Sequence, residues 1–247
     1  MESLREPRGA LHAYYGGLRL DLQATAVDPA SHIPAGKLPA IEAAALAACD
    51  ALDGVKDGVI DDPTRCTFSP AALRCAGPES DSCLTERQIA TLQKLYAGPR
   101  TSRGEPVFPG LVPGGETGRG GWGLWVAAPA PDRSLQFAFA SQAGPYLLHQ
   151  DPSYSFRIFN VDRDVRFRNE RVGLVLNAVN PDLSAFKRRG GKLILYHGWS
   201  DAALPLKPES HAVCLSGKGC LKCRVWEDVG RWWVNLGRTS GFPLVRE

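Results

Sequence analysis

The sequence predicts an α/β fold, and three stretches of the 247-residue chain carry that prediction. An alanine-rich stretch, 38–49, and an amphipathic stretch, 84–99, are typical of helices. A short apolar run, 192–196, is typical of a buried parallel strand, and a turn of polar residues follows it directly. Open α/β sheets carry their functional sites at such strand ends, so this turn is the first candidate for a site.

The composition is that of a globular protein and argues against several classes of partner. Hydrophobic residues make up 44% of the chain, and the length suits one large domain or two small ones. A net charge of +3 with scattered basic residues does not predict binding to nucleic acid. No stretch approaches 18 consecutive apolar residues, so we expect no membrane-spanning helix.

The most distinctive stretch is 49–66, CDALDGVKDGVIDDPTRC, which holds five aspartates and two glycines between two cysteines. Each interior glycine costs a helix about 1 kcal/mol relative to alanine, and neighbouring carboxylates repel, so a helix is disfavoured. Calcium binds six to eight oxygens from carboxylates and backbone carbonyls, and glycines let the backbone turn its carbonyls inward. We therefore predict a calcium-binding loop, called the acidic loop below.

Two alternatives exist for the acidic loop. Counted from Asp53, an EF-hand requires an acid or asparagine where Val55 stands and a glutamate where Thr64 stands, so an EF-hand is excluded. A short run of like charges is often a solvated turn without a ligand. That second alternative stays open.

Two helices are expected around the acidic loop. The first, 38–49, leads directly into it. The second, within 84–99, begins with a Thr-x-x-Gln capping box at Thr85–Gln88 and ends at Gly98–Pro99. The apolar stripe of the second helix consists of Leu84, Ile89, Leu92, Leu95 and Tyr96.

Residues 100–134 are rich in glycine and proline. The glycine run 114–121 invites comparison with a phosphate-binding loop. The run lacks the Gly-Lys-Ser/Thr ending and the preceding apolar strand of such a loop, so we do not interpret it as a phosphate-binding site. Trp122 and Trp125, which follow the run, either line an aromatic pocket or pack in a core.

Residues 135–186 predict a mixture of helix and loop. Asp162 and Asp164 lie there among several arginines. We expect this arrangement to be a solvated ion-pair face that contributes little to stability.

The polar turn after the predicted strand reads HGWSDAALP, residues 197–205. Its Gly-x-Ser-x-Ala sequence is one residue short of the Gly-x-Ser-x-Gly nucleophile elbow. Ala202 in place of glycine, and Pro205 where a helix should begin, argue against Ser200 as a nucleophile.

The cysteines and the chain ends bear on localisation and on metal binding. Seven cysteines, four of them close together, are typical of extracellular proteins, whereas residues 1–15 lack the apolar core of a signal peptide. We expect a piece of a longer secreted or periplasmic protein, with a cytosolic protein carrying reduced thiols as the alternative. The tail holds a candidate zinc set, although its spacing is unusual and three ordinary cysteines are the simpler reading. The candidate zinc ligands are His211, Cys214, Cys220 and Cys223.

Three of these stretches resemble the tannase/feruloyl esterase family, secreted α/β-hydrolases with a large lid domain. The acidic loop resembles the family's calcium site, the FPG…PG.E…GW..W segment resembles its lid, and RGGKLILYHGWSDAALP resembles the strand and loop of its catalytic acid. The resemblance covers about residues 24–208. It implies an unmatched segment at 1–23, a mixed α+β lid domain at 24–185, one core strand with the acid loop at 186–208, and an unmatched tail at 209–247.

The resemblance also implies roles for individual residues. A structural Ca²⁺ would be bound by the side chains of Asp50, Asp53 and Asp57 and by the carbonyls of Val55 and Val59. Disulfides would join Cys49 to Cys66 and Cys75 to Cys83, whereas the residues alone leave three pairings open. Asp201 would be the catalytic acid, and His197 would line the substrate pocket.

The implied activity is hydrolysis of small aromatic esters by a serine esterase. The family's nucleophile lies in a Cys-Ser-x-Gly-Gly segment and its base in a Gly-Met-x-His-Cys motif, and neither pattern occurs in this sequence. We therefore expect no turnover from this chain alone. A non-catalytic calcium-binding module is the alternative, and a small zinc-binding protein is a weaker one.

Overall fold

The computed structural model describes residues 28–119, 121–171, 185, 188–190 and 198–205. Within them the longer elements are α2 (Leu38–Cys49), α3 (Glu86–Ala97), α4 (Trp122–Trp125), α5 (Leu135–Gln142), the π-helix η7 (Ala143–His149) and α6 (Val161–Arg171). Short 3₁₀ turns join them: η1 (Pro29–Ser31), η2 (Ala35–Lys37), η3 (Asp50–Asp53), η4 (Pro63–Arg65), η5 (Pro70–Leu73), η6 (Pro131–Arg133) and η8 (Phe156–Ile158). These described ranges contain no strand, and the strand predicted at 192–196 lies outside them.

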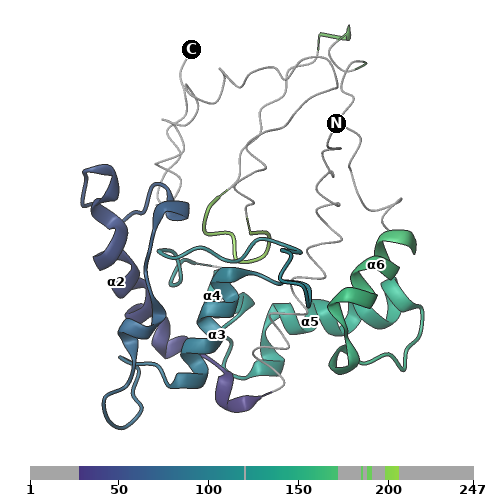
Figure 1. Cartoon of the computed structure of the whole chain (residues 1–247), viewed down its shortest axis with the longest axis horizontal. Coiled ribbons are helices and arrows are strands. Elements are labelled where there is room, and N and C mark those ends of the chain that lie inside the picture. The colour runs from purple at the N-terminus through teal and green to yellow at the C-terminus, as the bar shows by residue number, and fades with distance from the viewer. Residues whose placement is uncertain (1–27, 120, 172–184, 186–187, 191–197, 206–247) are drawn as a thin grey trace.

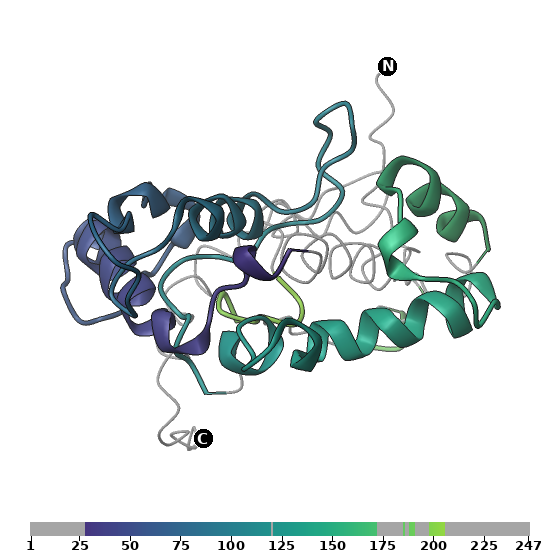
Figure 2. The same cartoon turned by 90° about the horizontal axis from the view of Figure 1, so that it is seen from below.

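Figure 1 shows α2, α3 and α4 gathered at one end of the described part, and Figure 2 shows α6 at the other end, beyond α5. Among the described helices, none is long and apolar enough to cross a membrane.

Helix α2 has the bounds that its sequence predicts. Its buried residues are Leu38, Ile41, Ala45 and Cys49, a spacing that forms one helical face. Proline in the first turn is tolerated because the N–H it lacks has no partner within the helix. At its C-terminal end the chain continues into η3, which stops at Gly54, where φ is +93°.

Helix α3 carries the predicted capping box. The backbone N–H of Gln88 donates to Oγ1 of Thr85 at 3.3 Å, and the N–H of Thr85 donates to Oε1 of Gln88 at 3.0 Å. Ile89, Leu92 and Leu95 are buried along one face, as the apolar stripe predicts. The helix therefore has both a defined start and a defined orientation against the core.

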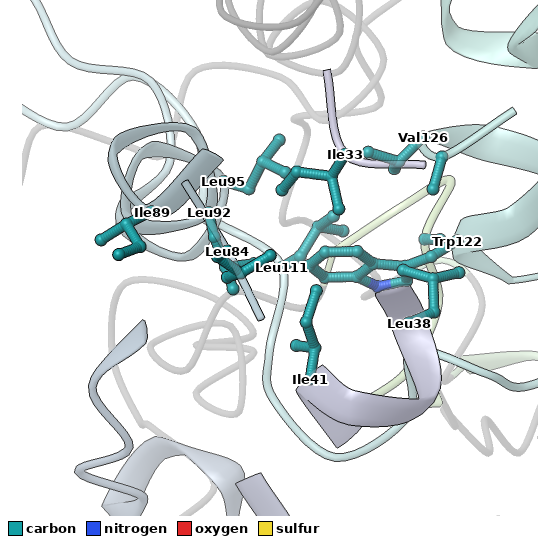
Figure 3. Packing of buried hydrophobic residues seen from close by; sticks show 12 residues of the cluster. Ile33, Leu38, Ile41, Leu84, Ile89, Leu92, Leu95, Leu111, Trp122 and Val126 are labelled. Carbon is teal, nitrogen blue, oxygen red and sulfur yellow. The ribbon is translucent and has the colours of Figure 1, made fainter. Parts of the chain in front are cut away.

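The main core lies between α2, α3 and α4. Figure 3 shows the indole of Trp122 among Leu38, Ile41 and Leu111. Trp122 is 2% exposed, and the partly buried Trp125 stacks on Phe139 of α5 with ring centroids 5.6 Å apart. Both tryptophans therefore pack against neighbouring side chains.

The expectation of a solvated face on α6 is wrong for Asp164, which is 1% exposed. Its carboxylate accepts hydrogen bonds from the Asn160 N–H at 2.8 Å, the Arg163 Nε at 2.7 Å and the Tyr154 hydroxyl at 3.1 Å. Burial alone raises the pKa of Asp164, but these hydrogen bonds outweigh burial and hold the pKa below its usual value. Composition alone did not reveal that the chain before α6 folds back over this carboxylate.

Candidate active site

Asp201 lies on the loop 198–205, and its own turn fixes its carboxylate. Oδ1 of Asp201 accepts the backbone N–H groups of Ala203 at 2.8 Å and Leu204 at 2.9 Å. The next residue, Ala202, is 4% exposed and belongs to the main core. The loop is thus anchored immediately after the carboxylate, while Asp201 itself is half-buried.

On the other side of Asp201, Ser200 lies in close contact with the backbone of Gly115. Figure 1 shows the loop 198–205, in yellow-green, beside the chain that precedes α4. A methyl group built on Gly115 would overlap Oγ of Ser200 and lie 2.5 Å from its Cβ. Ser200 lies in a turn, and the described residues after it, 201–205, form a bend and begin no helix, so the geometry is not that of a nucleophile elbow.

A buried carboxylate holds the turn that contains Gly115. Glu116 is 0% exposed and accepts the Gly114 N–H on both oxygens, at 3.2 and 3.0 Å. The hydroxyl of Tyr96, at the end of α3, donates to Oε1 of Glu116 at 2.5 Å. Burial raises the pKa of Glu116 despite these hydrogen bonds, and burial next to Glu116 raises the pKa of Tyr96 well above 10.

A shallow depression lies beside the Glu116 turn. It has a volume of about 310 Å³, and its walls include Leu38, Pro39, Glu116, Thr117 and Leu124. This volume is at the lower end of the range for small-molecule sites. The depression gives the described part of the chain a small, mostly apolar recess next to the turn that contacts Ser200.

The acidic loop is folded on itself through its own carboxylates. Asp50 is 5% exposed and accepts the N–H groups of Asp57 at 3.3 Å and Gly58 at 3.1 Å. Oδ1 of Asp53 accepts the Val55 N–H at 2.9 Å, and Oδ1 of Asp57 accepts the Val59 N–H at 3.1 Å. These bonds fold residues 50–59 through the side chains of the three predicted aspartate ligands.

The carboxylate oxygens of the acidic loop are chemically suited to bind a hard cation such as Ca²⁺. Burial raises the pKa of Asp61, and the negative charges of Asp53 and Asp57 raise it further. Carboxylates that repel one another are the oxygen donors that calcium prefers. Within the described residues, however, no group of three or more His, Cys, Asp or Glu side chains is gathered closely enough to bind a metal ion. Calcium at this loop therefore stays a prediction.

Both disulfides implied by the family resemblance are present. Cys49 is bonded to Cys66 across the acidic loop, and Cys75 is bonded to Cys83. The remaining residues singled out from the sequence, His197 and the candidate zinc ligands in 211–223, lie outside the described residues.

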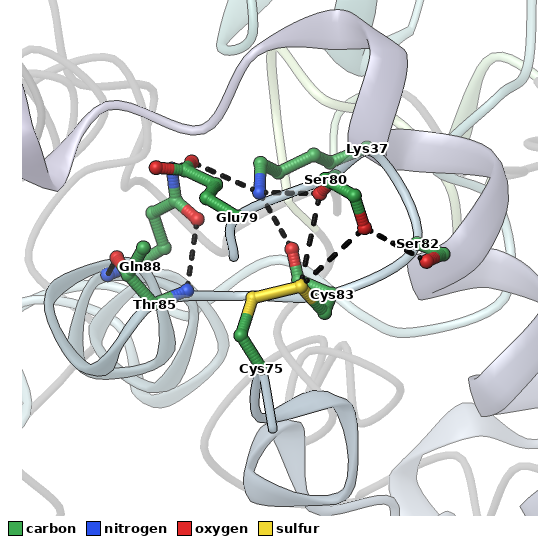
Figure 4. The surroundings of a disulfide bond; sticks show 8 residues. All are labelled: Lys37, Cys75, Glu79, Ser80, Ser82, Cys83, Thr85 and Gln88. Atoms are coloured by element: carbon green, nitrogen blue, oxygen red, sulfur yellow. Dashed lines mark hydrogen bonds and ion pairs between the residues drawn. A yellow bond between two sulfur atoms is a disulfide. The ribbon is translucent and has the colours of Figure 1, made fainter. Parts of the chain in front are cut away.

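A buried lysine, which the sequence did not reveal, supports the second disulfide loop. Figure 4 shows Nζ of Lys37 donating to the carbonyl oxygens of Ser80, at 2.8 Å, and Cys83, at 2.6 Å. Nζ also lies 3.0 Å from Oε1 of Glu79, and Lys37 is 2% exposed. Lys37 therefore connects the start of α2 to the loop that the Cys75–Cys83 bond closes.

The family profile for tannase and feruloyl esterase matches residues 13–212. The chain belongs to this family. The match begins ahead of residue 24, where the resemblance in the sequence starts, and it includes both the acidic loop and the Asp201 loop.

Relatives within the family are esterases. An uncharacterised esterase from Xanthomonas campestris pv. campestris is 41% identical over 191 residues, covering 72% of this chain and 32% of that protein. A protein named probable feruloyl esterase B, from Emericella nidulans, is 32% identical over 154 residues, covering 62% of this chain and 28% of that protein. The crystal structure of feruloyl esterase B from Aspergillus oryzae superposes with a TM-score of 0.64 and 26% identity, covering 78% of this chain and 37% of that one. The chain thus spans about a third of the length of these relatives.

Sequence reasoning missed the contacts that surround Asp201. Glu116 carried no signal for burial, because residue type predicts an exposed glutamate in the glycine-rich run 114–121. The contact between Gly115 and Ser200 joins positions 85 residues apart and has no local signal.

Proposed function

We propose that this chain supplies the lid and the catalytic acid of a serine carboxylic ester hydrolase that acts on small aromatic esters. The observation that carries the proposal is the fixed carboxylate of Asp201, since an aspartate that orients a catalytic histidine must itself be held in place. Family membership and the feruloyl esterases among its relatives support the reaction and the substrate class.

In this mechanism a serine attacks the ester carbonyl, and a histidine takes its proton and returns it to the leaving alcohol. Oδ1 of Asp201 already accepts two N–H groups, so Oδ2 is the oxygen that would accept the imidazole N–H. That hydrogen bond selects the tautomer and stabilises the imidazolium that forms. Asp201 is the part of the triad that we assign to this chain.

We further propose that the acidic loop binds one structural calcium ion. Its ligands would be the side-chain oxygens of Asp50, Asp53 and Asp57 and the carbonyl oxygens of Val55 and Val59. The ion would neutralise repelling carboxylates and hold the lid in shape. Two disulfides in the described part support an oxidising compartment, secreted or periplasmic, for the whole protein.

Two measurements test the esterase proposal. The purified chain should bind methyl ferulate or methyl gallate saturably, measured by quenching of tryptophan fluorescence, without releasing the free acid. Loss of binding would favour the non-catalytic calcium module. Steady release of ferulate that a serine-directed covalent inhibitor stops would contradict the expectation of no turnover.

The role of Asp201 is tested in a protein that joins this chain to a hydrolase core carrying the serine and the histidine. Asp201→Asn should lower kcat by about 10⁴-fold, because the imidazole is then held in the wrong tautomer. Asp132→Asn, at an exposed acid in η6, is the matched control and should leave kcat unchanged. A decrease below tenfold for Asp201→Asn would remove this residue from the triad.

A further inference from the structure

The loop that carries Asp201 is seated on a turn that lies far away in the sequence. Ser200, the residue before Asp201, contacts Gly115 so closely that no side chain fits at position 115. Ala202, the residue after Asp201, is buried in the main core. The residues on both sides of Asp201 are therefore held by contacts with the rest of the chain. The contact with Gly115 is made by a segment far from Asp201 in the sequence.

The turn at Gly115 is itself held from two directions. On one side, Glu116 accepts the Gly114 N–H and the Tyr96 hydroxyl. On the other, Ile60 of the acidic loop packs so closely on Gly114 that an added methyl group would lie 2.6 Å from its Cδ1. Gly114 also has φ = +97°, a conformation that side chains disfavour. The backbone of Gly115 is thus presented to Ser200 in one fixed position.

We propose that Gly115 is a positioning residue for the catalytic acid: its bare backbone is the seat against which Ser200 sets the position of Asp201. This inference rests on the proposed function for its meaning in catalysis, because an aspartate that shifts no longer orients its histidine. The contact itself is independent of that function. A side chain at position 115 displaces the loop 198–205, and removing the side chain at position 200 makes room for it.

The geometry supplies a rescue experiment. The added Cβ of Gly115→Ala meets Oγ and Cβ of Ser200, whereas the Cα of Ser200 lies 3.7 Å away, at ordinary van der Waals distance. The double variant Gly115→Ala/Ser200→Gly therefore removes the overlap that the single variant creates. Gly77→Ala is the matched control, because nothing lies within 4 Å of an added Cβ there.

Hydrogen–deuterium exchange of the purified chain gives the readout without any ester. In Gly115→Ala the amides of Ala203 and Leu204, which donate to Asp201, should exchange about tenfold faster, which corresponds to about 1.4 kcal/mol of local stability. The double variant should return to within about threefold of the wild-type rates, because the added Cβ then packs on the Cα at position 200, and Gly77→Ala should lie in the same range. Ser200→Gly alone removes the contact with Gly115 without replacing it and should exchange faster than the wild type.

Several results would overturn the proposal. Unchanged exchange in Gly115→Ala would show that the loop does not rest on this turn. Faster exchange that the double variant does not reverse, or unfolding of both variants, would show that Ser200 is not the group displaced. Wild-type exchange in Ser200→Gly alone would show that the contact between Ser200 and Gly115 does not hold the loop in place. None of these outcomes depends on ester hydrolysis. A result that contradicts the role of Gly115 can therefore be distinguished from one that contradicts the esterase proposal.

Discussion

The hydroxyl of Tyr96, at the C-terminal end of α3, donates a hydrogen bond of 2.5 Å to the fully buried carboxylate of Glu116. This pair connects a helix that is predictable from sequence to a turn that is not. It also places an ionisable group in a setting where its charge is disfavoured, since burial raises the pKa of Glu116 above 4.5. Glu116 should therefore contribute to the pH dependence of the fold's stability.

Tyr96→Phe should lower the free energy of unfolding by about 1–3 kcal/mol, because a buried acceptor loses its donor. The Tyr96 hydrogen bond lowers the pKa of Glu116, so its loss raises that pKa further. A carboxyl whose folded-state pKa is raised weakens the fold as pH rises from its unfolded value through the folded one. Urea unfolding should thus show a larger loss at pH 8 than at pH 5.

The matched control for this experiment is Tyr146→Phe, at an exposed tyrosine of η7, which should change stability by less than about 0.5 kcal/mol. Equal losses at pH 5 and pH 8 in Tyr96→Phe would contradict a titrating Glu116.

Lys37→Met should destabilise the chain by about 2–3 kcal/mol, because it removes the donor to two backbone carbonyl groups. Hydrogen bonds from Lys37 and Gln88 hold the pKa of Glu79 below 4.5. A carboxyl group whose pKa is lower in the folded state than in the unfolded state stabilises the fold at pH values above the unfolded-state pKa. This contribution is lost as the pH falls through the folded-state pKa. The decline of wild-type stability below pH 4.5 should therefore be shallower in Lys37→Met.

Thermal unfolding from pH 3 to pH 7 measures this effect. Lys94→Met, at an exposed lysine of α3, is the control and should retain the wild-type pH dependence. A Lys37→Met variant as stable as the wild type would show that the hydrogen bonds of Lys37 drawn in Figure 4 do not stabilise the fold.

The two disulfides should contribute unequally. Replacing Cys49 and Cys66 by alanine releases a loop with a sequence separation of 17 and should cost about 3 kcal/mol from chain entropy. The corresponding change at Cys75 and Cys83, with a separation of 8, should cost about 2.5 kcal/mol from the same source. Urea unfolding of the two double variants gives the comparison. A clearly larger loss at Cys75 and Cys83 would show that contacts such as those of Lys37 dominate over chain entropy.

Calcium should raise the melting temperature of the wild-type chain. A concentration 100 times the dissociation constant stabilises a single site by about 2.7 kcal/mol. The variant Asp53→Asn/Asp57→Asn should lose this gain. Without calcium it should be at least as stable as the wild type at pH 7, because both charges raise the pKa of the neighbouring Asp61 and so weaken the fold once Asp61 ionises.

Melting curves with calcium and with a calcium-selective chelator provide this test. Asp132→Asn should respond to calcium as the wild type does. A wild-type chain whose melting temperature is the same in calcium and in chelator would identify the acidic loop as a solvated turn.

Local signals account for most of what the sequence predicted. The bounds of α2, the capping box of α3 and the buried stripe of Ile89 and Leu92 all depend on residues a few positions apart. The burial of Lys37, Asp164 and Glu116 depends instead on carbonyl groups and hydroxyls supplied by distant segments or by backbone folded back on itself. Residue type predicts these side chains to be exposed, and only the tertiary contacts reverse that expectation.

In the candidate site, too, some features were predictable from the sequence and others depend on tertiary packing. Asp201 was identified by resemblance to a family, and its cradle of two N–H groups is local to the turn. The seat at Gly115 depends on the packing of two loops and leaves no pattern in either segment.

Gly114 and Gly115 are neighbours that exclude side chains for unrelated reasons, and this difference should be visible in evolution. Position 114 is restricted by its own dihedral angle as well as by Ile60, so no single partner change makes another residue acceptable there. At position 115 the atoms nearest to an added Cβ all belong to Ser200. In an alignment of related esterases, position 114 should remain glycine throughout, whereas alanine at position 115 should occur together with glycine at position 200. One glycine would then be marked by constancy and its neighbour by paired variation.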